Sequence, residues 1–396
     1  MKNKINKYFF KQFLRYFAVT LFSIISVAWI VQAVNFLDLV VEDGHAFGVY
    51  FSFSLLTIPK IITRLIPFCF LISIILTVVK FEKDNELIVL WTSGLNKIRI
   101  VNLTLLISFV TMLLHVFMAS TVTPLTLNIS RAILKNSTLD FFPTLIKEKK
   151  FNDSIEDVTF FVEEKAPDGS FKNIFIRDNN KIFDTGDLKS STIYAKSGYI
   201  QQDKNSRYII LFDGTIQKEK PNGKINSLKF KKTSLDIMGL TGKTITEPKI
   251  QETASSRLLT CTTGNDFFSS LTFINLDSFY YTKDGGKNII EDSHNCSKGN
   301  RNILIELNRR FGMPLYIPIL GLVVSFLLSS RKENGMAEFR KFIYFFIGVF
   351  VIVASEISIR YSTTDYYILL YYMFPFLIMS IIYLILLKTF KYENLS

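Results

Sequence analysis

The chain has 396 residues, of which 49% are hydrophobic, and it carries a formal net charge of +12. This apolar content is high for a soluble protein and is concentrated in long segments, which favours a membrane protein. The positive charge does not predict a nucleic-acid partner, because no compact basic patch accompanies an RNA- or DNA-binding motif.

Long apolar segments lie on both sides of a polar insert, three before it and three after it. Their residues are 13–34, 51–79, 99–121, 312–329, 342–359 and 366–387. A helix needs about 20 residues to cross a bilayer core. We therefore expect a polytopic α-helical membrane protein with six transmembrane helices, built as an N-terminal half (1–123), an inserted domain (124–305) and a C-terminal half (306–396).

The distribution of basic residues predicts the orientation of these helices. Basic side chains precede the first segment and fill the second and fourth loops: Lys2, Lys4, Lys7, Lys11, Arg15, Lys80, Lys83, Lys97, Arg99, Arg331, Lys332, Arg340 and Lys341. The first loop instead carries Asp38, Glu42 and Asp43. By the positive-inside rule, both termini lie in the cytoplasm and the insert faces outward.

The second apolar segment contains three residues that are unusual in a span. Pro59 and Pro67 should bend or interrupt its helix. Arg64 lies near its middle. A charge at that depth is costly, so Arg64 should face protein, water or a lipid headgroup. It could equally reach the interface or pair with another span for structural reasons alone.

The following loop predicts a short helix over residues 84–96. Asp84 can cap its N-terminus, Glu86 lies in its first turn, and Gly94 can end it. Its apolar face carries Leu87, Leu90 and Trp91. Such a helix could insert into a soluble partner, although an ordinary interfacial connector explains the same pattern.

The insert reads as short strands separated by turn residues. The expected strands are 158–164, 171–177, 191–196, 198–203, 207–219 and 225–238, and residues 160–177 resemble a hairpin. Strands without interleaved helices predict an all-β sandwich or open roll. Residues 251–300 are polar and irregular. Cys261 and Cys296 could form a disulfide if the insert lies in an oxidising compartment.

No constellation of residues predicts catalysis or a metal site. The three histidines have no partner at metal-ligand spacing, and no nucleophile motif is present. The TGKT stretch at 241–244 lacks the earlier glycine of a phosphate-binding loop. Glu356 and Arg360 are spaced for an ion pair. Since the charged ladder of a proton-driven pump is missing, the energy for any uphill transport should come from a partner.

Four stretches resemble the lipopolysaccharide-export permeases of the LptF/LptG (YjgP/YjgQ) type. They are YFFKQFL (8–14), which favours the LptF type, PKIITRLIP (59–67), DNELIVLWTSGLNK (84–97) and ELNRRFGMP (306–314). In the loop helix, the residues that match the family are Glu86, Leu87, Leu90, Gly94 and Leu95, whereas Trp91 and Ser93 depart from it. Elsewhere the matching residues are Pro59, Pro67, Glu306 and Arg310. The resemblance covers essentially the whole chain.

The resemblance implies a non-catalytic subunit of a transporter in the bacterial inner membrane. A second homologous permease would complete a heterodimer, and a cytoplasmic ABC ATPase dimer would bind ATP and Mg, so this chain itself needs no cofactor. Glu86, Leu87, Leu90, Trp91 and Gly94 would form the helix that couples to the ATPase. The insert would be a periplasmic jellyroll that passes lipopolysaccharide from the outer leaflet to a periplasmic bridge of similar folds.

The resemblance also implies a path for the lipid substrate. Asn35 and Asp38 stand where the family often has basic residues for lipid phosphates, so Arg64 or the partner permease would supply that contact. Phe160, Phe175 and Phe212 would line an apolar groove in the insert, or form its core. A permease for another lipid or lipoprotein, and an outward-facing receptor or scaffold with a ligand-binding β domain, remain alternatives.

Overall fold

The computed structural model describes residues 2–37, 40, 46–145, 148–155, 158–166, 169–178, 190–203, 206–219, 225–236, 249–263, 301–329, 337–362 and 365–393. The chain divides into two compact units. The helical unit comprises Met1–Gln32, Leu56–Asn128 and Lys249–Ser396. The sheet unit comprises Ala33–Leu55 and Ile129–Pro248.

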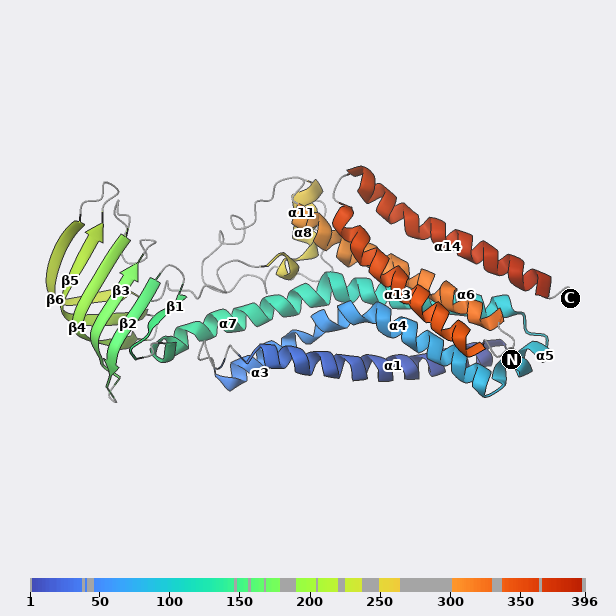
Figure 1. The fold of residues 1–396 in the computed structure, drawn as a ribbon, viewed down its shortest axis with the longest axis horizontal. Helices are drawn as coiled ribbons and strands as arrows, with labels where there is room; N and C mark the ends of the chain where they lie inside the picture. Colours follow the sequence, from blue (N-terminus) through green and yellow to red (C-terminus); the bar gives the residue numbers. More distant parts are fainter. Residues whose placement is uncertain are drawn as a thin grey trace. The chain divides into compact units, whose positions relative to one another are not determined.

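Helices make up most of the described chain (Figure 1). Before the strands come α1 (Lys2–Asn35), α3 (Phe47–Leu56), α4 (Ile58–Lys83), α5 (Glu86–Thr92), α6 (Lys97–Phe117), η1 (Met118–Val122) and α7 (Thr123–Leu145). After them come η2 (Ile250–Glu252), α8 (Ser255–Thr263), α11 (Arg301–Leu307), η4 (Asn308–Gly312), η5 (Met313–Tyr316), α12 (Ile317–Ser325), η6 (Phe326–Ser329), α13 (Ala337–Tyr361) and α14 (Asp365–Glu393).

Six helical runs in the described residues are long and apolar enough to cross a membrane. They are Lys4–Asn35, Phe47–Lys83, Lys97–Leu134, Arg301–Ser329, Phe339–Tyr361 and Tyr367–Lys391. Each contains most or all of one predicted apolar segment. Four runs extend the predicted segment at both ends, the fourth run extends it only at its start, and the last extends it only at its end. The prediction of a polytopic helical protein with an inserted β domain is therefore confirmed.

The prolines of the second run act differently. The helix breaks at Thr57, and Pro59 lies in the first turn of α4, where its missing N–H costs nothing. Pro67 lies inside α4, which continues past it to Lys83. The predicted interruption therefore comes from the first proline, just before the charged part of the helix.

The fourth run is the most irregular and the most buried. It passes from α11 through the π-helical turn η4 and the 3₁₀ turn η5 into α12, and the N–H of Met313 reaches the carbonyl of Asn308 across the π turn. The apolar part of the run is 83% buried, compared with 17% for α13. Gly321 permits close packing on α6, since a Cβ there would lie only 3.3 Å from Cβ of Ser108.

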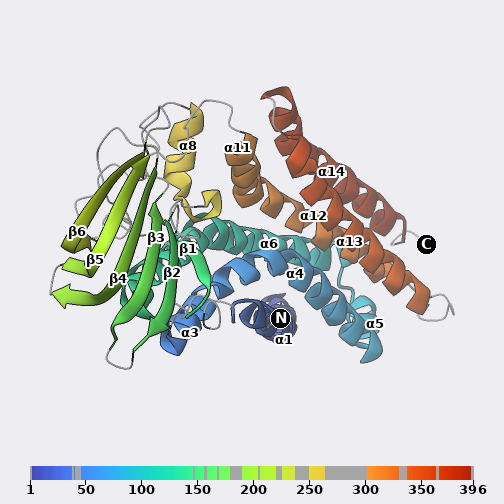
Figure 2. The ribbon, with the colours of Figure 1, turned by 60° about the vertical axis from the view of Figure 1, so that its left-hand side comes forward.

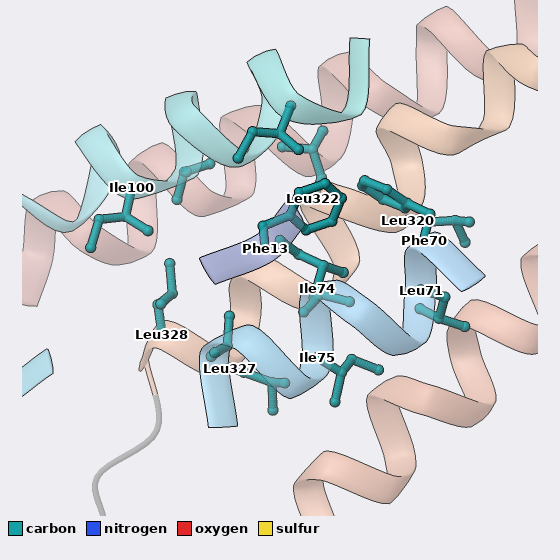
Figure 3. Close-up of a cluster of buried hydrophobic side chains, with 14 of the residues drawn as sticks. Phe13, Phe70, Leu71, Ile74, Ile75, Ile100, Leu320, Leu322, Leu327 and Leu328 are labelled. Atoms are coloured by element: carbon teal, nitrogen blue, oxygen red, sulfur yellow. The ribbon is translucent and has the colours of Figure 1, made fainter. Parts of the chain in front are cut away.

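The core of the helical unit forms where α4, α6 and α12 meet (Figure 3). Phe70, Leu71 and Ile74 of α4 and Leu320 of α12 are fully buried there. Phe13 of α1 packs its ring edge-on against Phe70, with 5.7 Å between the ring centres. This is the main apolar core of the unit, and smaller buried clusters lie around Tyr316 and Ile303.

The sheet unit contains one six-stranded antiparallel sheet in the order β1-β2-β3-β4-β5-β6. The strands are β1 (Phe151–Ile155), β2 (Val158–Lys165), β3 (Phe171–Asp178), β4 (Ser190–Asp203), β5 (Ser206–Glu219) and β6 (Ile225–Asp236). Figure 2 shows the curvature of the sheet. The hairpin of β2 and β3 is confirmed. β1 was not predicted, and two expected strands, 191–196 and 198–203, form the single strand β4.

The regular backbone pairing between neighbouring strands is interrupted along a line that crosses this sheet. Asn173 in β3 and Asp213 in β5 adopt left-handed backbone conformations with φ values of 50° and 47°, which asparagine and aspartate tolerate better than most residues. Beside the line, a Cβ on Gly214 would lie 2.2 Å from the carbonyl oxygen of Tyr194. The long strands therefore bend here, and only glycine leaves room for the neighbouring backbone.

Buried side chains of the sheet lie mostly on one face. They include Val158, Phe160, Ile176, Ile193 and Leu211, each with an exposed fraction of 2% or less. This alternation agrees with the period of two on which the strand predictions depended.

Candidate functional site

The helical unit contains a cavity of about 850 Å³ at the end where α4 begins and α13 ends. We call it the basic cavity. Its charged lining comprises Lys60, Arg64, Arg309, Arg310, Arg360, Glu306 and Glu356, and its apolar lining includes Leu127, Met313, Ile352, Val353 and Ile357. The basic side chains outnumber the two carboxylates, so the cavity carries an excess of positive charge beside hydrocarbon walls.

Arg310 is a buried structural residue of the cavity wall. It is 2% exposed, and its Nε donates to Glu306 at 3.1 Å. Its terminal nitrogens donate to the carbonyl oxygens of Ile250, Gln251 and Thr253 and to the hydroxyl of Ser255. These five hydrogen bonds equal the number of N–H donors that a guanidinium has. Arg310 therefore anchors residues 250–255 and retains no donor for a ligand.

Arg309 is the next residue in the chain, and its side chain is more accessible. It donates from Nη2 to Glu356 at 2.8 Å and from Nη1 to Glu306 at 3.3 Å. The side chain is 28% exposed. Two of its five N–H donors are used in these bonds, so the remaining donors are available to a ligand in the cavity.

The other basic residues of the cavity are not neutralised by carboxylates. Among the described residues, Lys60, Arg64 and Arg360 have no ion-pair partner within 4.0 Å. His115 is 2% exposed, its ring bonds to the backbone of Thr63, and its Nδ1 has no hydrogen-bond partner in the described part of the chain. Burial of an unpartnered nitrogen is costly, so the cavity favours a polar ligand beside it.

These features together suit an anionic amphiphile. Lysine and arginine make charge-assisted hydrogen bonds to phosphate and carboxylate oxygens. The hydrocarbon walls can contact acyl chains at the same time. Among the described residues, no group of three His, Cys, Asp or Glu side chains is placed to hold a metal ion.

The opposite end of the helical unit carries α5, near both ends of the chain (Figure 1). Asn85 precedes the helix in a left-handed conformation, and the predicted cap residue Asp84 instead ends α4. At the other end, the N–H of Gly94 bonds to the carbonyl of Trp91, and that of Leu95 bonds to the carbonyl of Leu90. With φ of +78° at Gly94, these bonds form a Schellman motif, as expected from glycine at this position.

The two faces of α5 have different roles. Leu87 is 6% exposed, and Leu90 and Trp91 also pack on the core of the helical unit. Ile88 and Val89 point away from it, with exposed fractions of 50% and 65%. Ile88 and Val89 are therefore the apolar residues of α5 most accessible to a partner, while Leu87, Leu90 and Trp91 also attach the helix to its own unit.

Polar and aromatic contacts fasten α5 to its neighbours. Tyr8 of α1 donates its hydroxyl to the Glu86 carboxylate at 3.0 Å. Lys97 lies between two aromatic rings, 5.7 Å from the centre of Trp91 and 5.6 Å from that of Phe390. A displacement of α5 would therefore act directly on α1 and α14.

The sheet has an apolar groove of about 570 Å³ on the face opposite its core. Four aromatic side chains from neighbouring strands border it: Phe151, Phe161, Phe175 and Tyr194. Their ring centres are 4.8 to 6.0 Å apart. The groove can therefore contact a hydrocarbon chain or another apolar surface.

The predicted substrate-path residues occupy different environments. Arg64 lines the basic cavity and Phe175 lines the groove of the sheet. Phe160 is 2% exposed in the sheet core, which is the alternative considered for it. Phe212 is half-buried and stacks on Tyr199 with 6.0 Å between ring centres. Asn35 is the exposed last residue of α1.

Several residues of these sites did not emerge from the sequence. Lys60 and Arg309 were not singled out, although charged residues inside or beside a span are a recognised signal of a site. The ion pair expected between Glu356 and Arg360 is wrong, because Glu356 pairs with Arg309 of a different helix. Cys296 lies outside the described residues, so its disulfide with Cys261 stays a prediction.

Comparison with known proteins gives one family and one relative. The family described as the lipopolysaccharide export system permease LptF/LptG matches residues 7–389. The uncharacterized protein RP871 of Rickettsia prowazekii (strain Madrid E) is 28% identical over 227 residues, which are 57% of this chain and 61% of the relative. The chain thus spans about three-fifths of the length of that relative. Because the family match covers nearly the whole sequence, the chain belongs to the LptF/LptG family of lipopolysaccharide export permeases.

Proposed function

We propose that this protein is a transmembrane permease subunit of an ABC-type exporter, and that it extracts lipopolysaccharide from the outer leaflet of the inner membrane. The observation that carries the proposal is the basic cavity. It presents Lys60 and Arg64 without carboxylate partners next to apolar side chains, and phosphate groups beside acyl chains are the matching ligand chemistry.

The proposed orientation follows the positive-inside rule. Both termini and α5 face the cytoplasm, three spans precede the strands β1–β6 and three follow them, and the six-stranded sheet lies in the periplasm as part of a jellyroll. In this orientation the basic cavity lies toward the outer leaflet, where the headgroup of the lipid is.

The energetics of lipid extraction explain why the basic cavity is not enough and a groove for the acyl chains is needed as well. Exposing an acyl chain to water costs about 0.8 kcal/mol per CH₂ group, so several chains together cost tens of kcal/mol. A covered path is therefore required. We propose that the aromatic groove of the sheet receives acyl chains and leads them to a periplasmic bridge protein of similar fold.

The energy would come from a cytoplasmic ATPase dimer that binds ATP and Mg, while this chain binds no cofactor. We propose that Ile88 and Val89, together with Glu86, form the contact with one ATPase subunit. A second, homologous permease completes the transmembrane part.

The substrate is tested by native mass spectrometry of the full chain in lipid nanodiscs with purified lipopolysaccharide. A Lys60→Gln/Arg64→Gln double variant should bind at least tenfold less, since two charge-assisted contacts of about 1 kcal/mol each are removed. Arg340→Gln, which removes a basic residue at the α5 end of α13, is the matched control and should bind as the wild type does. Equal binding by all three would reject the cavity as the lipid site.

The partners are tested by affinity capture from membranes in mild detergent. The wild type should recover an ATPase and a second permease, and Val89→Asp should lose the ATPase while keeping the permease. Leu87→Ala tests the other face of α5, where only the attachment of the helix is affected. If the wild type recovers neither partner, a self-contained outward-facing receptor or scaffold becomes the better account of the chain.

A further inference from the structure

The part of α4 that carries Lys60 and Arg64 lies between two interruptions of the helix. The chain breaks at Thr57, just before α4 begins, and Pro67 lies inside α4. Proline has no N–H, so the carbonyl of Thr63, four residues earlier, does not receive the usual α-helical hydrogen bond. A helix that lacks a backbone bond at such a point depends on neighbouring groups for its local direction.

A buried histidine supplies a hydrogen bond at this position. His115 of α6 is 2% exposed, and its ring bonds to the backbone of Thr63. The N–H of a helical residue bonds to the residue four positions earlier, so the carbonyl is the backbone group left for the ring. Because Nδ1 has no partner in the described part of the chain, Nε2 is the nitrogen that donates. His115 therefore replaces the donor that Pro67 lacks.

A second side chain from the same helical run bonds to α4 one turn away. The hydroxyl of Thr123, the first residue of α7, donates to the carbonyl of Pro59 at 3.4 Å. His115 and Thr123 both belong to the continuous run Lys97–Leu134. Thr63, His115 and Thr123 all line the basic cavity. The third run therefore holds the backbone of α4 at two points beside the cavity.

These backbone contacts matter because ion pairs do not fix the two cations. Among the described residues, neither Lys60 nor Arg64 has a carboxylate within 4.0 Å. The two residues are four positions apart, so they lie on one face of α4. Thr63 directly precedes Arg64 in the chain. A change in direction of the helix at Thr63 would therefore move both positive charges relative to the cavity.

We propose that His115 is a positioning residue of the basic cavity: it donates to the carbonyl that Pro67 leaves without a helical partner, and so orients Lys60 and Arg64 toward the phosphates of the lipid. The proposal rests on the function proposed above and adds a residue that acts through two others. Contacts that are already oriented bind more tightly, because less order has to be created on binding.

The proposal is tested by native mass spectrometry of the full chain in nanodiscs, with diphosphorylated lipid A and with dephosphorylated lipid A that has the same acyl chains. His115→Leu should bind the diphosphorylated lipid about fivefold more weakly, which corresponds to about 1 kcal/mol for one hydrogen bond. Its binding of the dephosphorylated lipid should match the wild type. Equal losses for both lipids would mean a general destabilisation of the unit and would overturn the positioning role.

His115→Gln keeps an N–H donor and separates the donor from the ring. It should bind diphosphorylated lipid A more tightly than His115→Leu does and approach the wild type. If His115→Gln loses as much binding as His115→Leu, the hydrogen bond to Thr63 is not the cause, and the role is rejected.

Pro67→Ala tests the bond from the other side. Alanine supplies the N–H that proline lacks, so the Thr63 carbonyl regains its helical hydrogen bond. Adding His115→Leu to Pro67→Ala should then weaken binding of diphosphorylated lipid A by less than about twofold relative to Pro67→Ala alone. The same loss in both backgrounds would show that His115 acts on the lipid by another route, such as direct contact, and would overturn the proposal.

Thr111→Val is the matched control on the same helix. Thr111 lies one turn before His115, is 5% exposed and donates to the carbonyl of Ile107 in its own helix. It does not line the basic cavity. The variant should bind both lipids as the wild type does. A selective loss for the diphosphorylated lipid would mean that any buried polar group of α6 has this effect, which would reject the special role of His115.

The outcomes distinguish this inference from the proposed function. If Lys60→Gln/Arg64→Gln weakens binding while His115→Leu does not, the cavity function stands and the positioning role is rejected. If the wild type does not bind diphosphorylated lipid A, the proposed function itself fails.

Discussion

The two ends of the helical unit use opposite arrangements of polar and apolar side chains. At the cavity end, charged residues are drawn inward and joined to one another, as with Glu306, which accepts hydrogen bonds from both Arg309 and Arg310. At the α5 end, apolar residues such as Val89 face outward. Burying charge requires partners from several distant segments, whereas exposing an apolar patch requires only a local helix that is well attached. The first arrangement suits a ligand and the second suits a protein surface.

The largest loss of stability is expected from replacing Arg310 at the cavity end. Replacing it with Leu leaves the Glu306 carboxylate without its buried partner and the carbonyls of residues 250, 251 and 253 without a donor. We expect a loss of about 3–5 kcal/mol in the free energy of unfolding. Arg360→Leu, at an exposed position in the same cavity, should change it by less than about 0.5 kcal/mol. Thermal unfolding in mild detergent measures both. Equal losses would show that burial does not separate the two residues.

At the α5 end, the predicted effect depends on the face of the helix. Leu87→Ala removes a side chain that is 6% exposed, and we expect it to cost about 2 kcal/mol. Val89→Ala should cost less than about 0.5 kcal/mol, because that side chain is mostly exposed. Hydrogen–deuterium exchange of the α5 amides should rise in the first variant alone. A rise in the second would contradict the assignment of the two faces.

A substitution at Gly94 tests the C-terminal end of α5 separately from side-chain packing. Its φ of +78° is costly for any residue with a Cβ, although no atom lies within 4 Å of the position where a Cβ would be. Gly94→Ala should therefore destabilise the helix end by about 1 kcal/mol through backbone strain alone. Gly48→Ala, at a helical position with equally open space and no positive φ, is the control and should be neutral or slightly stabilising.

The smallest predicted effect is that of the hydrogen bond from Tyr8 to Glu86. The bond is exposed to solvent, so Tyr8→Phe should cost about 0.5 kcal/mol, the low end of the range for a hydrogen bond. Glu86→Gln keeps an acceptor for the hydroxyl and should cost less. A loss above about 2 kcal/mol in either variant would mean that the α5 end relies on polar contacts, as the cavity end does.

Local features of the fold followed from the sequence. The six apolar runs, the break near Pro59, the Schellman glycine Gly94 and the hairpin around Gly169 each depend on residues that are close together in the chain. In the hairpin, the N–H of Gly169 bonds to the carbonyl of Ala166, and φ of the glycine is +83°. Such signals are intrinsic to the segment, so no tertiary information is needed to interpret them.

The features that the sequence did not reveal depend on residues far apart in the chain. Glu356 has Arg360 one turn away, yet it pairs with Arg309, because the packing of α13 places them together. The apolar pattern of α5 was visible, but Leu87 and Val89 could be assigned to opposite roles only once the position of the core was known. Phe160 and Phe175 are likewise both aromatic residues of adjacent strands. Only their burial in the folded sheet shows that Phe160 lies in the core and Phe175 lines the groove.

The π-helical turn of η4 also bears on what a deletion at this point of the chain would do. A π turn holds one more residue than an α turn and takes it up within a single turn. Deleting Asn308 would therefore restore regular helix and leave α11 and α12 facing as they do now. It would, however, shorten by one residue the spacing from Glu306 to Arg309 and Arg310, the two residues that now donate hydrogen bonds to it. The span should tolerate this deletion better than the basic cavity does.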